Sequence, residues 1–238
     1  MLLLSANASW WEQLQTSFVF NLIEKDRWKY LWDGLGVTLK ITFFAVLIGI
    51  LIGMVVAGVR ATHDMTGKLK IPNALCRVYL SIIRGTPVMV QLLIAYFAIF
   101  TSPKIEKVVV AILAFGINSG AYVAEIFRSG IMSIDKGQFE AGRSLGFNYI
   151  QTMWLIIMPQ ALKNVLPALG NEFIVLLKET SISGYIALQD LTKGGDIIRS
   201  QTFEAFPLIA VAVIYWIFVA GLSYLLGIFE RRLRTSDH

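Results

Sequence analysis

Charged and amide side chains interrupt several stretches of this sequence that are otherwise apolar. In one stretch Asn118, Tyr122 and Glu125 follow at intervals of four and three residues, so they share one face of a helix. In another stretch Asn171 and Glu172 stand side by side. Ionisable groups placed in apolar segments are energetically costly and indicate functional sites by default. We expect these five residues to contact a polar solute.

The composition places these residues in a membrane protein. The chain has 238 residues, of which 56% are hydrophobic and 16% charged, and its mean hydropathy is +0.65. A soluble domain has about 25% charged residues, so lipid is the expected surrounding. The single Cys76 and two histidines make neither a disulfide nor a zinc site, and we expect no metal. The net charge of +5 is spread between apolar blocks, which argues against nucleic acid as a partner.

Five uncharged stretches are long enough to cross a bilayer, which takes about 20 helical residues. They cover residues 41–59, 85–103, 108–124, 144–162 and 205–229. The fourth contains several polar residues, and hydropathy alone does not decide between it and the neighbouring stretch 165–191. If 165–191 spans and 144–162 lies at the surface, the loops richest in lysine and arginine all fall on one side, as expected for the cytoplasm. We therefore predict an all-α membrane protein with five spans, its N-terminus outside and its C-terminus inside.

The domain organisation follows from these spans. Residues 34–234 form one transmembrane domain, residues 1–33 an N-terminal interfacial segment without an assigned role, and residues 235–238 a cytoplasmic tail. In the first span Gly49, Gly53 and Ala57 recur every four residues, which lets a neighbouring helix come close. We expect that neighbour to belong to the same chain, although a contact between subunits is the alternative.

A polar segment at residues 133–147 is too hydrophilic to span and is predicted to form a short surface helix. Asp135 can cap its start with Gln138 reaching back, and Gly146 can end it in a left-handed conformation. Ala141 and Gly142 leave little side chain on one side, where a partner could approach closely.

These motifs together resemble the permease subunits of ATP-binding-cassette importers, in particular the polar amino-acid subfamily of the histidine, glutamine and arginine type. The surface loop at about 133–150 carries EAG at 140–142 followed by Gly146, and IIMP follows at 156–159. Gly142 stands where the family usually has a second alanine. The resemblance covers about residues 34–234, and its other motifs are RGTP at 84–87 with Gln91, GAYVAEI at 120–126 with Arg128 and Gly130, PQAL at 159–162 and LKETS at 177–181.

The resemblance implies a type I importer permease that does not hydrolyse ATP. Two permease subunits, identical or homologous, would form a pathway in the lipid of a bacterial inner membrane, and a binding protein outside would deliver the amino acid. The chain lacks a Gly-x-x-x-x-Gly-Lys-Ser/Thr loop, so ATP and magnesium are expected on a separate ATPase subunit. The short helix would enter a cleft of that ATPase, with these coupling residues: Gln138, Glu140, Ala141, Gly142, Leu145 and Gly146.

The resemblance also favours Glu172 and Arg84 as the substrate-binding pair. Glu172 could accept hydrogen bonds from the ammonium of an amino acid, and Arg84 could donate to its carboxylate. Structural alternatives remain open, since Arg84 could face lipid headgroups and Glu125 could pair with Arg128 three residues later. The alternative function is an ATP-independent, ion-coupled carrier, because intramembrane carboxylates also suit proton or sodium coupling.

Overall fold

The computed structural model describes residues 9–235, and these are helical almost throughout, without a strand. Short segments of wider π-helix or tighter 3-10 helix adjoin several α-helices. The π-helical segments are Val19–Ile23, Ala95–Ile99 and Met153–Ile157, and the 3-10 segments are Glu24–Asp26 and Thr180–Ile186. The helices are α1 (Trp10–Phe18), α2 (Trp28–Thr66), α3 (Lys70–Gly85), α4 (Val88–Ile94), α5 (Lys107–Met132), α6 (Lys136–Ser144), α7 (Tyr149–Thr152), α8 (Met158–Glu179), α9 (Leu191–Thr202) and α10 (Phe206–Thr235). The all-α fold class is therefore confirmed.

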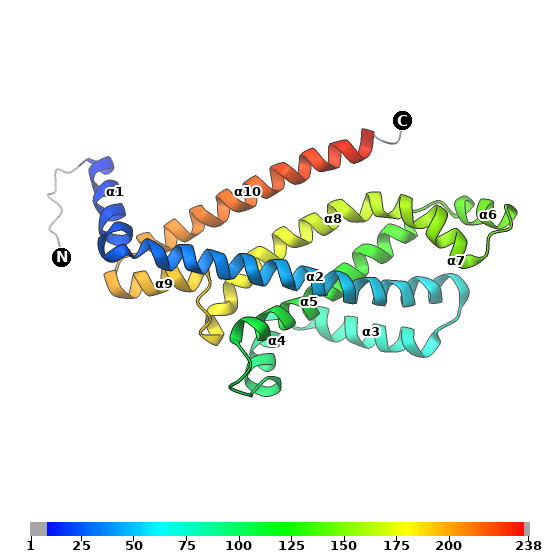
Figure 1. Ribbon diagram of the computed structural model, residues 1–238, viewed down its shortest axis with the longest axis horizontal. Helices are drawn as coiled ribbons and strands as arrows, with labels where there is room; N and C mark the ends of the chain where they lie inside the picture. The colour runs from blue at the N-terminus through cyan, green and yellow to red at the C-terminus, as the bar shows by residue number, and fades with distance from the viewer. Residues whose placement is uncertain (1–8, 236–238) are drawn as a thin grey trace.

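Helix α2 runs along most of the molecule, and α5 packs against it through small residues (Figure 1). Gly49 lies against Ser119, and Gly53 lies against Val123, so close that a Cβ atom at either glycine would collide with α5. The stripe of small residues therefore serves packing within the chain, as expected. Because α2 begins at Trp28, the expected boundary after residue 33 falls inside this helix.

Within residues 9–235, three helices are long and apolar enough to cross a membrane, namely α2, α5 and the Phe206–Leu233 part of α10. A fourth span results if the bent pair Lys70–Gly85 and Val88–Ile99 is one crossing. Of the 18 residues in the most apolar part of each helix, 61% are buried in α5 but only 6% in α10. Helix α10 diverges from the bundle (Figure 1), so most of its surface is left for lipid or another subunit.

The uncharged stretch 85–103, expected as one straight span, is broken at its start. Helices α3 and α4 meet at an angle of 106°. Pro87 has no backbone N–H and disfavours helical geometry at the residue before it. Thr86 accordingly adopts an extended conformation, with φ −124° and ψ 146°.

The expected fourth crossing, 165–191, corresponds to α8, but its limits differ. Helix α8 begins at Met158, directly after α7 and the π-helical segment Met153–Ile157. It ends at Glu179, after which a tight turn leads to Ile186. Helix α8 is not among the helices that are apolar enough to span by composition, yet it packs against α2, α5 and α10. The count of five spans therefore depends on α8, whose Glu172 contacts α5 through Ser119, whereas its Asn164, Asn171 and Lys178 are exposed.

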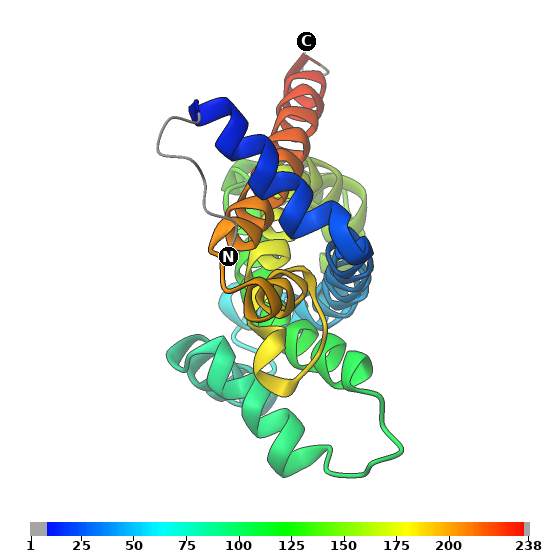
Figure 2. The same ribbon diagram turned by 90° about the vertical axis from the view of Figure 1, so that its left-hand side faces the viewer.

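The two ends of the bundle carry different elements. Figure 1 places α6, α7, the turn between α2 and α3 and the C-terminal end of α10 toward one end, and α1 and α9 at the other. In the end-on view of Figure 2, α1 crosses over the bundle and α4 projects to one side. The loops expected in the cytoplasm are thus gathered at the end that carries α6.

Candidate functional site

Helix α5 is the central element of the polar region, because side chains from several other helices contact it. Glu172 of α8 accepts a hydrogen bond of 2.8 Å from the Ser119 hydroxyl. Ser119 is fully buried, and Gly49 of α2 lies against its side chain. The absence of a side chain at Gly49 thus leaves room for the hydroxyl that holds Glu172.

Arg84 reaches the same part of α5 from another direction. Its guanidinium lies over the ring of Tyr122, 5.7 Å from the ring centroid. Ser119 and Tyr122 are three residues apart, so they occupy neighbouring positions about one helical turn apart. Glu172 and Arg84 therefore contact α5 at nearly the same level, through separate partners. Tyr122 is 38% exposed and Asn171 is also exposed, so both can contact a solute.

Asn118 connects α5 to the break between α3 and α4. The Asn118 amide donates to Oε1 of Gln91 at 2.9 Å, and Asn118 itself is 3% exposed. The Gln91 amide in turn donates to the carbonyl oxygens of Ile83 and Thr86 and to the Thr86 hydroxyl. These carbonyls lie where the helix ends and lacks internal donors. Gln91 thereby stabilises the break next to Arg84.

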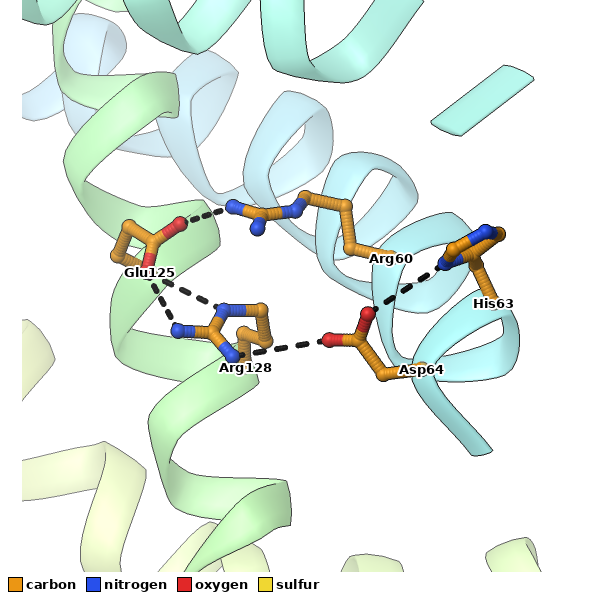
Figure 3. Close-up of polar contacts among 5 residues, drawn as sticks. All are labelled: Arg60, His63, Asp64, Glu125 and Arg128. Carbon is orange, nitrogen blue, oxygen red and sulfur yellow. Dashed lines mark hydrogen bonds and ion pairs between the residues drawn. The ribbon is translucent and has the colours of Figure 1, made fainter. Parts of the chain in front are cut away.

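Glu125, the third residue of the polar face on α5, belongs to a network of charges (Figure 3). It pairs with Arg60 of α2 and accepts hydrogen bonds of 3.1 and 3.2 Å from Arg128. Arg128 also lies 3.7 Å from Asp64, whose other oxygen is 3.5 Å from His63. The expected helix pair of Glu125 with Arg128 is confirmed, and the network joins α2 to α5.

The short surface helix α6 forms at the expected place with well-defined ends. Asp135 accepts a hydrogen bond from the backbone N–H of Gly137 at 2.6 Å. At the other end Gly146 has φ +81°, and the N–H groups of Gly146 and Phe147 donate to the carbonyls of Arg143 and Gly142. This pattern is the Schellman motif that ends helices at a left-handed glycine.

Two details of α6 differ from expectation. Gln138 does not reach back to the start of the helix, because its amide oxygen accepts from Gln160 of α8 at 3.4 Å. Gly142 does not contribute to an open surface, because it is buried against α7 and the turn that follows. A Cβ atom at this position would lie 2.7 Å from Cγ2 of Thr152 and 3.2 Å from Ile156. Because Gly142 has no side chain, α6 can lie close to α7 and to Ile156.

The exposed side of α6 is formed by other residues. Glu140 and Ala141 are exposed, and Leu145 is 71% exposed. Phe139 faces inward and packs against the cluster that contains Ile131. The helix is thus fixed to the bundle on one side and presents a charge and an apolar tip on the other.

The sequence reasoning did not assign three residues that take part in these contacts. Ser119 and Gln91 have short or neutral polar side chains, so no charge indicated their role in an apolar context. Arg60 directly follows the predicted span 41–59, where a cation is expected at the membrane surface. The carboxylate of Glu125 on α5 indicated that a cation would lie nearby, but the sequence does not show which residue of another helix pairs with it.

The fold and these contacts define an all-helical, multi-spanning membrane protein with a polar region inside the bundle and a short, capped helix at one end. The chain belongs to the binding-protein-dependent transport system inner membrane component family, whose model matches residues 45–235. It is thus a multi-pass protein of the inner membrane, as expected from the sequence.

Two relatives show the extent of the similarity. The putative glutamine transport system permease protein GlnP of Rickettsia typhi is 38% identical over 207 residues, covering 86% of this chain and 93% of the relative. The glutamine transport system permease protein GlnP of Escherichia coli K12 is 36% identical over 214 residues, covering 87% and 97%.

Solved structures agree with this placement. The crystal structure of an amino acid ABC transporter with histidines contains a chain that is 41% identical, with a TM-score of 0.80, covering 94% of this chain and 99% of that one. The MetNI methionine ABC transporter in an inward-facing conformation has a TM-score of 0.76 at 20% identity, covering 88% and 99%, and so shares the fold.

Proposed function

We propose that the chain is the permease subunit of an ATP-binding-cassette importer and that it moves a polar amino acid past α5, between Glu172 and Arg84. The observation that carries the proposal is the approach of these two opposite charges to α5 within one helical turn, through Ser119 and Tyr122. The amino acid transporter with 41% identity and the glutamine permease relatives support the same class of solute.

The chemistry of a free amino acid suits this pair. Its ammonium needs a hydrogen-bond acceptor, which Glu172 supplies with the carboxylate oxygen that Ser119 leaves free. Its carboxylate suits the planar guanidinium of Arg84. Tyr122 and Asn171, both exposed, would contact the side chain, while Asn118 positions the break through Gln91. Glutamine is our preferred substrate, because its amide needs no further charge in the site.

The energy for transport would come from another polypeptide. Helix α6 presents Glu140, Ala141 and Leu145 outward, and Gln138, Gly142 and Gly146 set its attachment and its end. We infer that this helix enters a cleft of an ATPase subunit, which binds the ATP and magnesium. A binding protein outside the membrane would deliver the amino acid, and a second permease chain would complete the pathway.

Uptake of labelled L-glutamine into energised membrane vesicles tests the proposal. Glu172→Gln keeps the shape of the side chain and removes its charge, and we expect uptake to fall about tenfold, the equivalent of about 1.4 kcal/mol. Glu179→Gln is the control, because it makes the same change seven residues further along α8. Uptake should persist when ionophores dissipate the ion gradients and stop when ATP is removed.

Two outcomes would contradict the proposal. Full uptake in the Glu172→Gln variant would remove Glu172 from the substrate site. Uptake that depends on an ion gradient and continues without ATP would favour the ion-coupled carrier instead.

A further inference from the structure

Helix α3 has a polar stripe that the contacts described above use only in part. Arg77, Ser81 and Arg84 follow at intervals of four and three residues and therefore share one face. The opposite face is apolar and well exposed, which suits lipid or a neighbouring apolar helix. Its residues are Ile71, Leu75, Val78 and Ile82, with exposures between 56% and 77%.

The polar stripe lines an open cavity of about 510 Å³. Arg60 of α2 and Glu125 of α5 line the same cavity, and Leu80 and Gly85 complete it. Cavities that bind small ligands have volumes of about 300 to 1,000 Å³, so the space is large enough for an amino acid. Charged side chains inside membrane bundles face such cavities rather than lipid.

The charges around this cavity do not balance. Three arginines line it against the one carboxylate of Glu125. That carboxylate already pairs with Arg60 and with Arg128 (Figure 3). In residues 9–235, neither Arg77 nor Arg84 has a carboxylate within 4 Å. The cavity therefore has guanidinium groups available for an anionic ligand.

We propose that this cavity is a second station for the transported amino acid, in which Arg77 binds its carboxylate, and that it favours solutes of zero or negative net charge over cationic ones. The proposal rests on the proposed function and adds a residue and a substrate class to it. A guanidinium matches a carboxylate with two parallel hydrogen bonds. The side-chain charge of arginine or lysine would meet the surplus positive charge and be repelled.

Arg84 connects this station with the site at Glu172. Its guanidinium lies over Tyr122 and its side chain also lines the cavity, so the carboxylate of a solute can pass from Arg84 to Arg77. Arg77 is seven residues, or two helical turns, nearer the start of α3. In Figure 1 that start lies toward the end of the bundle that carries α6. A solute moving from Glu172 toward that end would meet Arg77 second.

The test is equilibrium binding of labelled L-glutamine, L-glutamate and L-arginine to the full chain, purified with its ATPase partner and held in nanodiscs. We expect the wild type to bind glutamate and glutamine at least tenfold more tightly than arginine. Arg77→Gln should weaken glutamate binding about tenfold and reduce the discrimination against arginine. Arg77→Lys should restore part of both, and the control Lys70→Gln, on the same helix but outside the cavity, should change neither.

The outcomes separate this proposal from the function on which it rests. If Glu172→Gln weakens binding of every amino acid while Arg77→Gln leaves the ratio of glutamate to arginine unchanged, the second station is wrong and the proposed function stands. If Arg77→Gln alters that ratio while Glu172→Gln has no effect, the station stands and the Glu172 site is wrong. If the wild type binds none of the three, both are overturned.

Discussion

The packing of α2 on α5 predicts that one glycine of α2 tolerates no side chain while another tolerates it easily. A Cβ atom added at Gly53 would lie 2.7 Å from Cβ of Val123 and 2.9 Å from the backbone nitrogen of Ala124. Favourable contacts between carbon atoms are about 3.5 to 4.0 Å long. Since one neighbour is backbone, a rotamer change cannot remove the collision and α5 must move. At Gly58, on the same helix, a Cβ atom meets nothing within 4 Å.

The expected magnitudes follow from these distances. Gly→Ala in a helix interior stabilises by roughly 0.5 to 1 kcal/mol through backbone entropy, and both variants share that gain. Gly53→Ala additionally overpacks a buried contact, which costs about 1 to 3 kcal/mol. Because 1 kcal/mol shifts the melting temperature of a chain of this size by about 2 to 4 °C, Gly53→Ala should melt roughly 2 to 12 °C below Gly58→Ala.

The assay is thermal unfolding of the purified chain in one detergent, with wild type, Gly53→Ala and Gly58→Ala side by side. Gly58→Ala should melt at or slightly above the wild type. Equal melting temperatures for the two variants would refute the close approach of α2 and α5 on which the polar region depends.

Two further predictions concern the end of the bundle that carries α9 and the C-terminal end of α6. Asp190 caps α9 by accepting from the backbone N–H of Lys193, and burial raises the pKa of its carboxyl from 3.8 to about 6. The folded chain therefore holds this proton more tightly than the unfolded chain, so stability should be lost as the pH rises from about 4 through about 6. Asp190→Asn, which keeps the capping oxygen, should flatten this part of the melting profile, and an unchanged profile would contradict the assignment. Gly146→Ala should destabilise the chain by about 1 kcal/mol, because position 146 is left-handed, and should speed amide exchange at Phe147. Gly146→Asn should destabilise it less. Equal exchange at Phe147 in the wild type and both variants would refute the motif.

Local signals in the sequence were sufficient to predict α6. Asp135 and Gly146 specify its start and end through interactions within a few residues, and these do not depend on the rest of the fold. The stripe that begins with Gly49 and Gly53 was likewise predictable, because close helix packing in a membrane requires small residues at helical spacing. The Glu125–Arg128 pair lies within one helix and follows the same rule.

Features that depend on distant partners could not be predicted. Gln138 was expected to reach back to the start of α6, and its actual partner, Gln160, is brought near only by the packing of α8. The sequence did not show what packs against Gly142, because a glycine at a helix surface allows close approach of another subunit as well as of another segment of the same chain. The break at Pro87 has a local cause, but the uncharged stretch 85–103 runs across it and concealed the change of direction. Gln91, which stabilises that break, contacts Asn118 across 27 residues of sequence.

The most direct test of the account is whether an ATPase subunit binds the exposed side of α6. The tagged full chain, solubilised gently from its native membrane, would be compared with Glu140→Arg and with Glu24→Arg, which reverses an exposed charge near the opposite end of the bundle. We predict that an ATPase co-purifies with the wild type and with Glu24→Arg and is lost from Glu140→Arg. Purification of the wild type without an ATPase, under conditions that preserve other membrane complexes, would contradict the account.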